Sequence, residues 1–188
     1  MSRNLENWLD SYVRLQENTE PAKIFDQWVA YSIIAAALRR KVKLRLGRLT
    51  YNTNLYIVLV AAPGIARKTQ AIKFGEKFLD KEKMPDINCA ADSATKEAMT
   101  DDIENSGVEF LMEDNITVYR HSSLNIISKE FESFLGQKKE NTRMLTALTD
   151  LFDCPPDWSS RTRHGKSNVI VRPWINLLAA TTPDSLAN

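Results

Sequence analysis

The stretch YIVLVAAPGIARKTQAIKFGEKFL, residues 56–79, decides the fold class. It opens on a continuous apolar run, which is typical of a strand covered on both faces of a parallel sheet. After the loop AAPGIARKT, apolar residues return at helical spacing. We therefore predict a buried strand over residues 55–61, a loop, and a helix over residues 69–81.

The loop has nearly the form of a phosphate-binding loop, G-x-x-x-x-G-K-[ST]. In such a loop, backbone N–H groups surround the phosphates at a helix N-terminus, the lysine contacts them, and the hydroxyl binds Mg²⁺. We predict that ATP phosphates and Mg²⁺ bind here. The predicted site comprises Ala62, Pro63, Gly64, Ile65, Ala66, Arg67, Lys68, Thr69 and Gln70. The alternative is an ordinary strand-to-helix turn that contains Lys-Thr by chance.

Two side chains depart from the motif, because Ala62 and Arg67 stand where it has glycines. Glycine is useful in such a loop because backbone must approach an anion closely or adopt positive φ. Ala62 is the mildest replacement. Arg67 fits if its backbone is already near helical geometry and its side chain points outward.

The rest of the chain alternates helices and strands. Helical periodicity in residues 5–13 and 21–40 predicts a helical prefix over residues 1–40, packed on a core of residues 41–188. We expect a strand with one basic face over residues 39–48, a turn over 51–54, a strand-turn-strand over 108–120 and buried strands at 123–128 and 174–180. Further helices are expected over residues 93–105, 131–136 and 142–152. This order predicts an α/β fold with a mostly parallel sheet flanked by helices.

Composition limits the class of protein. A net charge of +1 provides no global field for a polyanion or a membrane surface. The cysteines Cys89 and Cys154 lack metal-ligand spacing and are expected to be free thiols in a reducing compartment. The most apolar run, residues 28–38, is about half the roughly 20 residues that a membrane helix needs. We expect a soluble, cytoplasmic protein with no membrane partner.

Several segments together resemble a known family. They are FDQWVAYSIIAAALRRKV, NLYIVLVAAPGIARKTQAI, SATKEAMTDDI, LNIISKEFESFLG, LTDLFDCPPDWSSRTRHG and INLLAATTPDSL. The combination resembles the P-loop ATPase region, of AAA+/RecA-like type, of primase-helicase proteins carried by phages and mobile elements, over about residues 24–188. The resemblance implies an ATP- and Mg²⁺-dependent DNA helicase motor that forms a homo-oligomer and continues into a C-terminal lid. In such relatives arginine or glycine precedes the lysine, so Arg67 fits the pattern and Ala62 departs from it.

A P-loop NTPase also needs a carboxylate at the end of a neighbouring strand, to hold Mg²⁺ or to polarise the attacking water. Glu130 follows the strand at 123–128 and is the candidate for both roles. Lys129 stands beside it where an aspartate is common, which places a cation near the expected metal position. Glu132 is a possible substitute. The alternative for Glu130 is a solvated acid at a helix start.

Three other segments have two interpretations each. Arg161 or Arg163 is a candidate for stabilising phosphoryl charge from a neighbouring subunit, or lies in a basic surface loop. Thr182 or Thr181 would sense the γ-phosphate, while Thr182 before Pro183 also suits helix capping. The basic strand at 39–48 could follow a DNA backbone or be a solvated strand edge.

Three functions remain open on this basis. The first is an ATPase motor acting on DNA, in which Glu130 activates water. The second is a weakly or non-hydrolysing, nucleotide-dependent DNA-binding or assembly module. The third is a structural domain that binds no nucleotide.

Overall fold

A computed structural model describes residues 7–80, 82, 84–90, 95–112, 114–136, 138–161 and 167–187. The helices are α1 (Trp8–Leu15), α2 (Lys23–Leu38), the 3₁₀ turn η1 (Arg39–Lys41), α3 (Lys68–Glu76), α4 (Lys96–Asn105), α5 (Phe131–Leu135), α6 (Lys138–Phe152) and α7 (Pro183–Ala187). The strands are β1 (Lys43–Leu46), β2 (Leu49–Asn52), β3 (Tyr56–Val60), β4 (Asn88–Cys89), β5 (Gly107–Leu111), β6 (Val118–Ser128), β7 (Asp157–Arg161), β8 (Ser167–Val171) and β9 (Pro173–Thr181).

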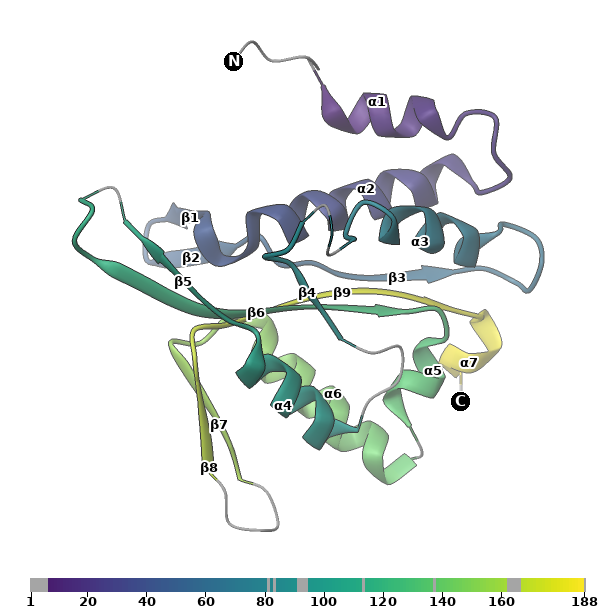
Figure 1. The fold of residues 1–188 in the computed structure, drawn as a ribbon. Coiled ribbons are helices and arrows are strands. Elements are labelled where there is room, and N and C mark those ends of the chain that lie inside the picture. Colours follow the sequence, from purple (N-terminus) through teal and green to yellow (C-terminus); the bar gives the residue numbers. More distant parts are fainter. Residues whose placement is uncertain are drawn as a thin grey trace.

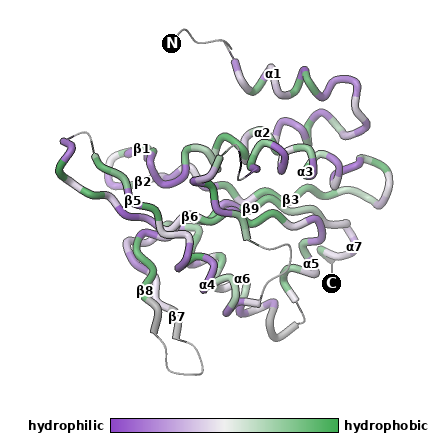
Figure 2. The backbone as a smooth tube through the Cα atoms, viewed as in Figure 1, coloured by the Kyte–Doolittle hydropathy of each residue, from purple (hydrophilic) through white to green (hydrophobic). Residues whose placement is uncertain are grey.

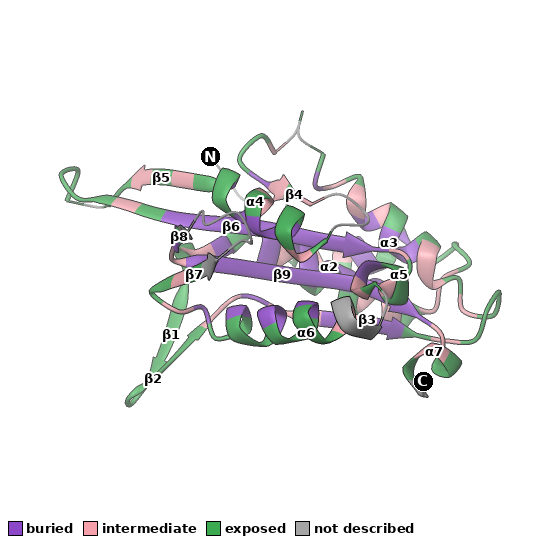
Figure 3. Ribbon diagram, turned by 90° about the horizontal axis from the view of Figure 1, so that it is seen from below, coloured by how far each residue is buried: buried purple, intermediate pink, exposed green. Residues whose placement is uncertain are grey.

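The central sheet has the strand order β3-β9-β6-β4, and all three of these pairings are parallel. β5 pairs antiparallel with the first part of β6, so the sheet is mixed but mostly parallel. The prediction of an α/β fold with a mostly parallel sheet flanked by helices is therefore confirmed. The last strand, β9, lies between β3 and β6 and is buried along its whole length (Figures 1 and 3).

Helices cover both faces of this sheet, because alternate residues of β9 point to opposite sides. Leu178 and Ala180 pack with α1, α2 and α3 in one apolar cluster, whereas Leu177 and Ala179 pack with α4, α5 and α6 in the other. Figure 2 shows the apolar strands enclosed between these helical layers. α3 approaches α2 so closely that a side chain at Gly75 would collide with Val29.

A buried polar contact joins the two central strands. Asn125 of β6 and Asn176 of β9 face each other in the register, and Nδ2 of Asn176 donates to Oδ1 of Asn125 at 3.2 Å. The same Nδ2 donates to the Ser32 hydroxyl on α2, while Oδ1 of Asn176 accepts from the Leu55 amide. The buried amide of Asn176 is thereby satisfied.

One prediction about local structure was wrong. Residues 49–52 form strand β2, which pairs with β1 through a turn at Gly47 and Arg48, instead of leading into a turn at 51–54. Of the segment with the candidate arginines, residues 159–161 belong to β7 of a second antiparallel ribbon, β7–β8, and residues 162–166 lie outside the described residues. β3 is an edge strand of the sheet, and both of its faces are covered as predicted, because Ile57 and Leu59 lie in one apolar cluster while Tyr56 and Val58 pack against the other.

No helix in the described ranges is long and apolar enough to cross a lipid bilayer. Among the described residues, Cys89 and Cys154 form no disulfide, and Cys89 is exposed whereas Cys154 is buried.

Asp26 on α2 lowers the stability of the folded state in a pH-dependent way. It is 2% exposed, and Oδ1 has no hydrogen-bond partner among the described residues. Burial raises its pKa from 3.8 to about 6, so the folded state holds a proton that the unfolded chain releases at lower pH. Below about pH 4 the carboxyl is protonated in both states, so it does not reduce the free energy of unfolding. That free energy decreases as the pH rises from about 4 through 6, because the unfolded chain then ionises more readily than the folded one.

We therefore expect Asp26→Asn to raise the free energy of unfolding at pH 7 by roughly 2–3 kcal/mol, and to change it little at pH 4. Urea denaturation at both pH values measures the difference, and comparison with wild type at each pH cancels the other titrating groups. The exposed Asp150→Asn is the control. An equal gain at both pH values would show that the charge is not the cause.

Candidate phosphate-binding site

The loop between β3 and α3 forms the candidate site. It starts at the carboxyl end of β3 and ends at Lys68, the first residue of α3. Ala62, Gly64, Arg67, Lys68, Thr69 and Gln70 line a pocket of about 190 Å³. This volume is below the 300–1,000 Å³ of typical small-molecule sites, so the pocket matches a phosphate group better than a whole nucleotide.

Several residues that line this pocket have backbone amides without an acceptor. The amides of Gly64, Arg67, Lys68 and Thr69 have no hydrogen-bond acceptor among the residues that the structure describes. Those of Lys68 and Thr69 belong to the first turn of α3, where the helix dipole also favours an anion. The loop therefore presents donors and partial positive charge to the same pocket.

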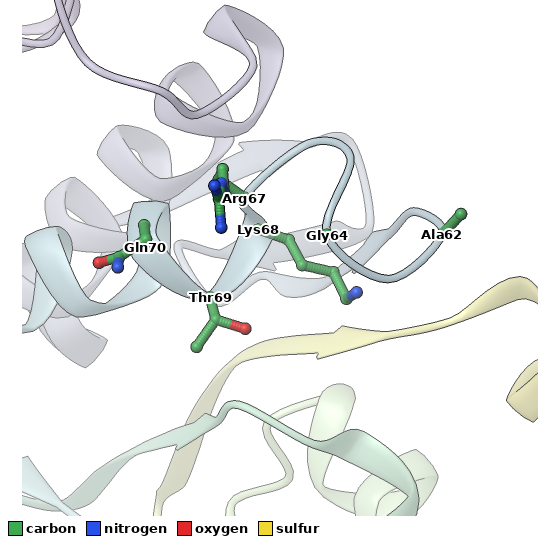
Figure 4. A pocket seen from close by; sticks show the side chains of 6 residues that line it. All are labelled: Ala62, Gly64, Arg67, Lys68, Thr69 and Gln70. Carbon is green, nitrogen blue, oxygen red and sulfur yellow. The ribbon is translucent and has the colours of Figure 1, made fainter.

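The side chains of Lys68 and Thr69, the last two residues of the motif, also lie at this pocket. The Lys68 ammonium donates to the Ala61 carbonyl at 3.1 Å, so the lysine folds back under the loop. Figure 4 shows this course toward Gly64 and Ala62, and shows Thr69 extending from the helix in the direction of β9. An anion in the pocket would replace a single neutral carbonyl as the partner of the ammonium group.

The backbone conformation explains why alanine is tolerated at position 62 and corrects the helical geometry expected for Arg67. Ala62 is not among the residues with positive φ, so its position does not require glycine. Arg67 has φ 48° and ψ 35°, which is left-handed instead of the helical geometry that we expected. Its side chain does point outward, and its Nε contacts the Glu20 carboxylate at 2.8 Å. A half-exposed ion pair thus accompanies a strained backbone.

Comparison of Arg67→Gly with Arg67→Ala isolates this strain, because both variants lose the contact with Glu20. Only alanine keeps a Cβ in the left-handed region, which disfavours side chains. We expect the glycine variant to be more stable than the alanine variant by about 1 kcal/mol in urea denaturation. Equal stabilities would mean that the loop relaxes out of this conformation.

Parallel strands bring other predicted residues to the same edge of the sheet. β3, β6 and β9 run in one direction, so the loop, Glu130 after β6 and Thr181 at the end of β9 all lie at the carboxyl edge. The Ala61 amide donates to the Thr181 carbonyl at 3.4 Å, which ties the loop to β9. Ligands of open α/β sheets bind at this edge.

Glu130 is exposed at the N-cap of α5, and its carboxylate accepts a hydrogen bond from the Ser133 hydroxyl at 3.2 Å. Lys129 forms an ion pair with Glu76, at the end of α3, with 3.0 Å between Nζ and Oε1. The positive charge of Lys129, next to the expected metal position, is therefore paired with a carboxylate. Glu132 is exposed in the first turn of α5.

Thr182 has the contacts of a helix cap. Its hydroxyl lies 2.9 Å from the Ser185 hydroxyl and accepts from the Ser185 amide at 3.3 Å, at the start of α7. Thr181 is buried at the last position of β9. Capping at Thr182 is therefore observed, and a sensor role for either threonine stays a prediction.

The structure does not bring the backbone of Arg161 to the loop. Only the backbone of Arg161 is described, at the far end of the β7–β8 ribbon, and Arg163 lies outside the described residues. This ribbon enters β9 at Pro173, roughly 26 Å along the strand from Thr181 (Figure 1). Within one chain, Arg161 is on the opposite edge of the sheet from the loop.

A second pocket, of about 370 Å³, lies next to the first and shares Gln70 with it. Gln16, Thr19, Glu20, Pro21, Gln70 and Phe74 line it. Gln16 is 3% exposed, and its Nε2 has no acceptor in the described part of the chain. Sequence reasoning missed this pocket because the α1–α2 connection meets α3 only through tertiary packing.

Among the described residues, no three His, Cys, Asp or Glu side chains are grouped so as to hold a metal ion by themselves. Mg²⁺ usually binds through one or two protein groups together with substrate phosphates, so Thr69 and Glu130 are a fitting pair of ligands.

Comparison with models of known protein families gives no match for this chain, and a search of curated proteins gives none either.

Proposed function

We propose that this chain is an ATP-binding and ATP-hydrolysing P-loop domain. The observation that carries the proposal is the shared position of the loop, Glu130 and Thr181 at the carboxyl edge of one parallel sheet. α3 follows β3 on one face and α5 with α6 follows β6 on the other, so the chain diverges around this edge. Open α/β sheets bind ligands where the connections diverge in this way.

The phosphates would occupy the smaller pocket. The amides without an acceptor at Gly64, Arg67, Lys68 and Thr69 would donate to phosphate oxygens, and the Lys68 ammonium would supply the charge. These donors are already in place around the pocket, so little reorganisation is needed on binding.

The metal and the attacking water would lie between Thr69 and Glu130. Mg²⁺, when bound, neutralises charge on the phosphate oxygens. The Thr69 hydroxyl and, through water, the Glu130 carboxylate would hold the ion. Glu130 would also accept a proton from the attacking water, and its hydrogen bond from Ser133 orients the carboxylate for this role.

The nucleobase fits the larger pocket beside Gln70. Phe74 provides an apolar ring, and the Gln16 amide provides a buried donor without an acceptor among the described residues. An adenine ring nitrogen would satisfy that donor, whose burial without a partner costs roughly 1–3 kcal/mol.

The motor function is proposed from the resemblance to phage and mobile-element primase-helicases. It includes replication DNA as the partner and a homo-oligomer in which Arg161 or Arg163 of one copy reaches the loop of the next. The separation of Arg161 from the loop within one chain supports this arrangement in trans.

The exposure of Glu130 favours a second candidate function. An exposed carboxylate is weakly placed to activate water, because solvent competes for its hydrogen bonds. The alternative is a nucleotide-dependent DNA-binding or assembly module that binds ATP and hydrolyses it slowly or not at all.

Calorimetry with ATP–Mg²⁺ and a steady-state ATPase assay with and without single-stranded DNA test these functions. Saturable ATP binding with DNA-stimulated turnover supports the motor. Saturable ATP binding without turnover supports the nucleotide-dependent DNA-binding or assembly module. Absence of both ATP binding and a rise in melting temperature would eliminate both, since a ligand at 100 times its Kd adds about 2.7 kcal/mol to stability.

A further inference from the structure

The β1–β2 ribbon projects from the body of the molecule and is exposed along nearly its whole length (Figure 3). Its register pairs Lys43 with Asn52 and Arg45 with Thr50, which places these polar residues on one face. Arg48 lies in the turn that joins the strands. We use the name basic face for Lys43 and Arg45 on this side together with Arg48 in the turn.

The charge of the basic face is not compensated within the described structure. Residues 27–75 contain no aspartate or glutamate. None of Lys43, Arg45 and Arg48 forms an ion pair with a described carboxylate. Like charges on one short ribbon repel one another, so an anionic partner that bridges them would relieve the repulsion.

Other cations extend the positive region toward the amino edge of the sheet. Lys41 lies over the Phe110 ring and Arg172 over the Tyr119 ring. The buried His121 lies near these charges: burial, together with the charges of Arg39, Lys41, Arg40 and Arg172, lowers its pKa to about 4. These cations lie toward the amino edge, at the opposite end of the parallel strands from the phosphate loop, where Arg39 and Arg120 are paired with Asp86 and Glu109.

We propose that the basic face of the β1–β2 ribbon binds the phosphate backbone of a nucleic acid strand. This proposal rests on the proposed function, which has DNA as the partner, and adds that the DNA binds at the amino edge of the sheet. Regularly spaced cations on a strand, about 7 Å apart at alternate positions, suit a linear polyanion.

The opposite face of the ribbon argues against a lipid surface. Leu44, Leu46, Leu49 and Tyr51 lie there and are between 50% and 60% exposed. A ribbon that lay with these apolar groups in a membrane would point Lys43 and Arg45 away from the lipid head groups. Basic residues that assist membrane binding must reach the head groups, so the two-faced arrangement favours a nucleic acid on the basic face.

The salt dependence of DNA binding tests the proposal. A fluorescein-labelled thymidine oligonucleotide is titrated without ATP at several salt concentrations, and log K is plotted against log salt. For Lys43→Ala, Arg45→Ala and Arg48→Ala combined, we expect weaker binding and a slope shallower by about 2, since each lost single-strand phosphate contact removes about 0.7. The double variant Arg45→Lys, Arg48→Lys should bind like wild type, because phosphate contacts need charge more than shape.

A matched control combines Arg14→Ala, Lys73→Ala and Arg143→Ala, which remove as much charge from exposed positions on α1, α3 and α6. An equal loss in this control, an unchanged slope in the ribbon variant, or no binding by wild type would each overturn the proposal. Binding to phosphatidylserine vesicles but not to the oligonucleotide, or self-association alone, would do the same. Because ATP is absent, failure of the loop to bind nucleotide leaves this result unaffected.

Discussion

Replacement of Lys68 by alanine should weaken ATP–Mg²⁺ binding by about 100-fold and reduce turnover to background. The ammonium group lies 3.1 Å from the Ala61 carbonyl, and Lys68 lines the pocket together with the loop residues Ala62, Gly64 and Arg67. Loss of hydrogen bonds to a charged group costs about 1.5–3 kcal/mol, which corresponds to roughly 10- to 150-fold in affinity.

Calorimetry measures this loss directly, and Lys73→Ala is its matched control. Lys73 is an exposed lysine on the same helix and does not line the pocket. The control should bind ATP as wild type does. If Lys68→Ala retained wild-type affinity, nucleotide binding would have to be assigned to another part of the molecule.

Glu130→Gln should separate binding from hydrolysis. The substitution keeps the size of the side chain and removes the negative charge and the ability to accept a proton. We expect ATP affinity to stay within a few-fold of wild type and turnover to fall by about 10²- to 10⁴-fold, the usual contribution of a general base.

Glu132→Gln is the control for this variant, because Glu132 is also exposed in the first turn of α5. Steady-state assays at saturating ATP compare the two variants. If turnover is lost in Glu132→Gln and kept in Glu130→Gln, Glu132 is the residue that activates water and the assignment of Glu130 is wrong.

The strand-loop-helix unit could be predicted from sequence because its signals are local. A continuous apolar run, a loop with Gly64 and the spacing after Lys68 lie within one short stretch, and the structure has β3 and α3 there. The strand before Glu130 and the strand before Thr182 were predicted for the same reason. Their parallel alternation with helices was sufficient to predict the fold class.

Other features depend on contacts between distant segments and had no local signal. The ion pair between Lys129 and Glu76 joins the end of β6 to the end of α3. The pocket beside Gln16 forms where the α1–α2 connection meets α3. The left-handed backbone at Arg67 was not predicted, because arginine rarely adopts that conformation and Glu20, its ion-pair partner, comes from another segment.

The pair Asn125 and Asn176 has a consequence for the candidate site as well as for folding. A shift of one position between β6 and β9 would set Asn176 opposite Leu124 or Ile126 and deprive a buried carboxamide of its partner. This penalty keeps β6 and β9 in the observed register. It thereby fixes the relative positions of Glu130 and Thr181 at the carboxyl edge of the sheet, so a polar contact in the middle of the molecule sets the spacing of two residues of the proposed nucleotide site.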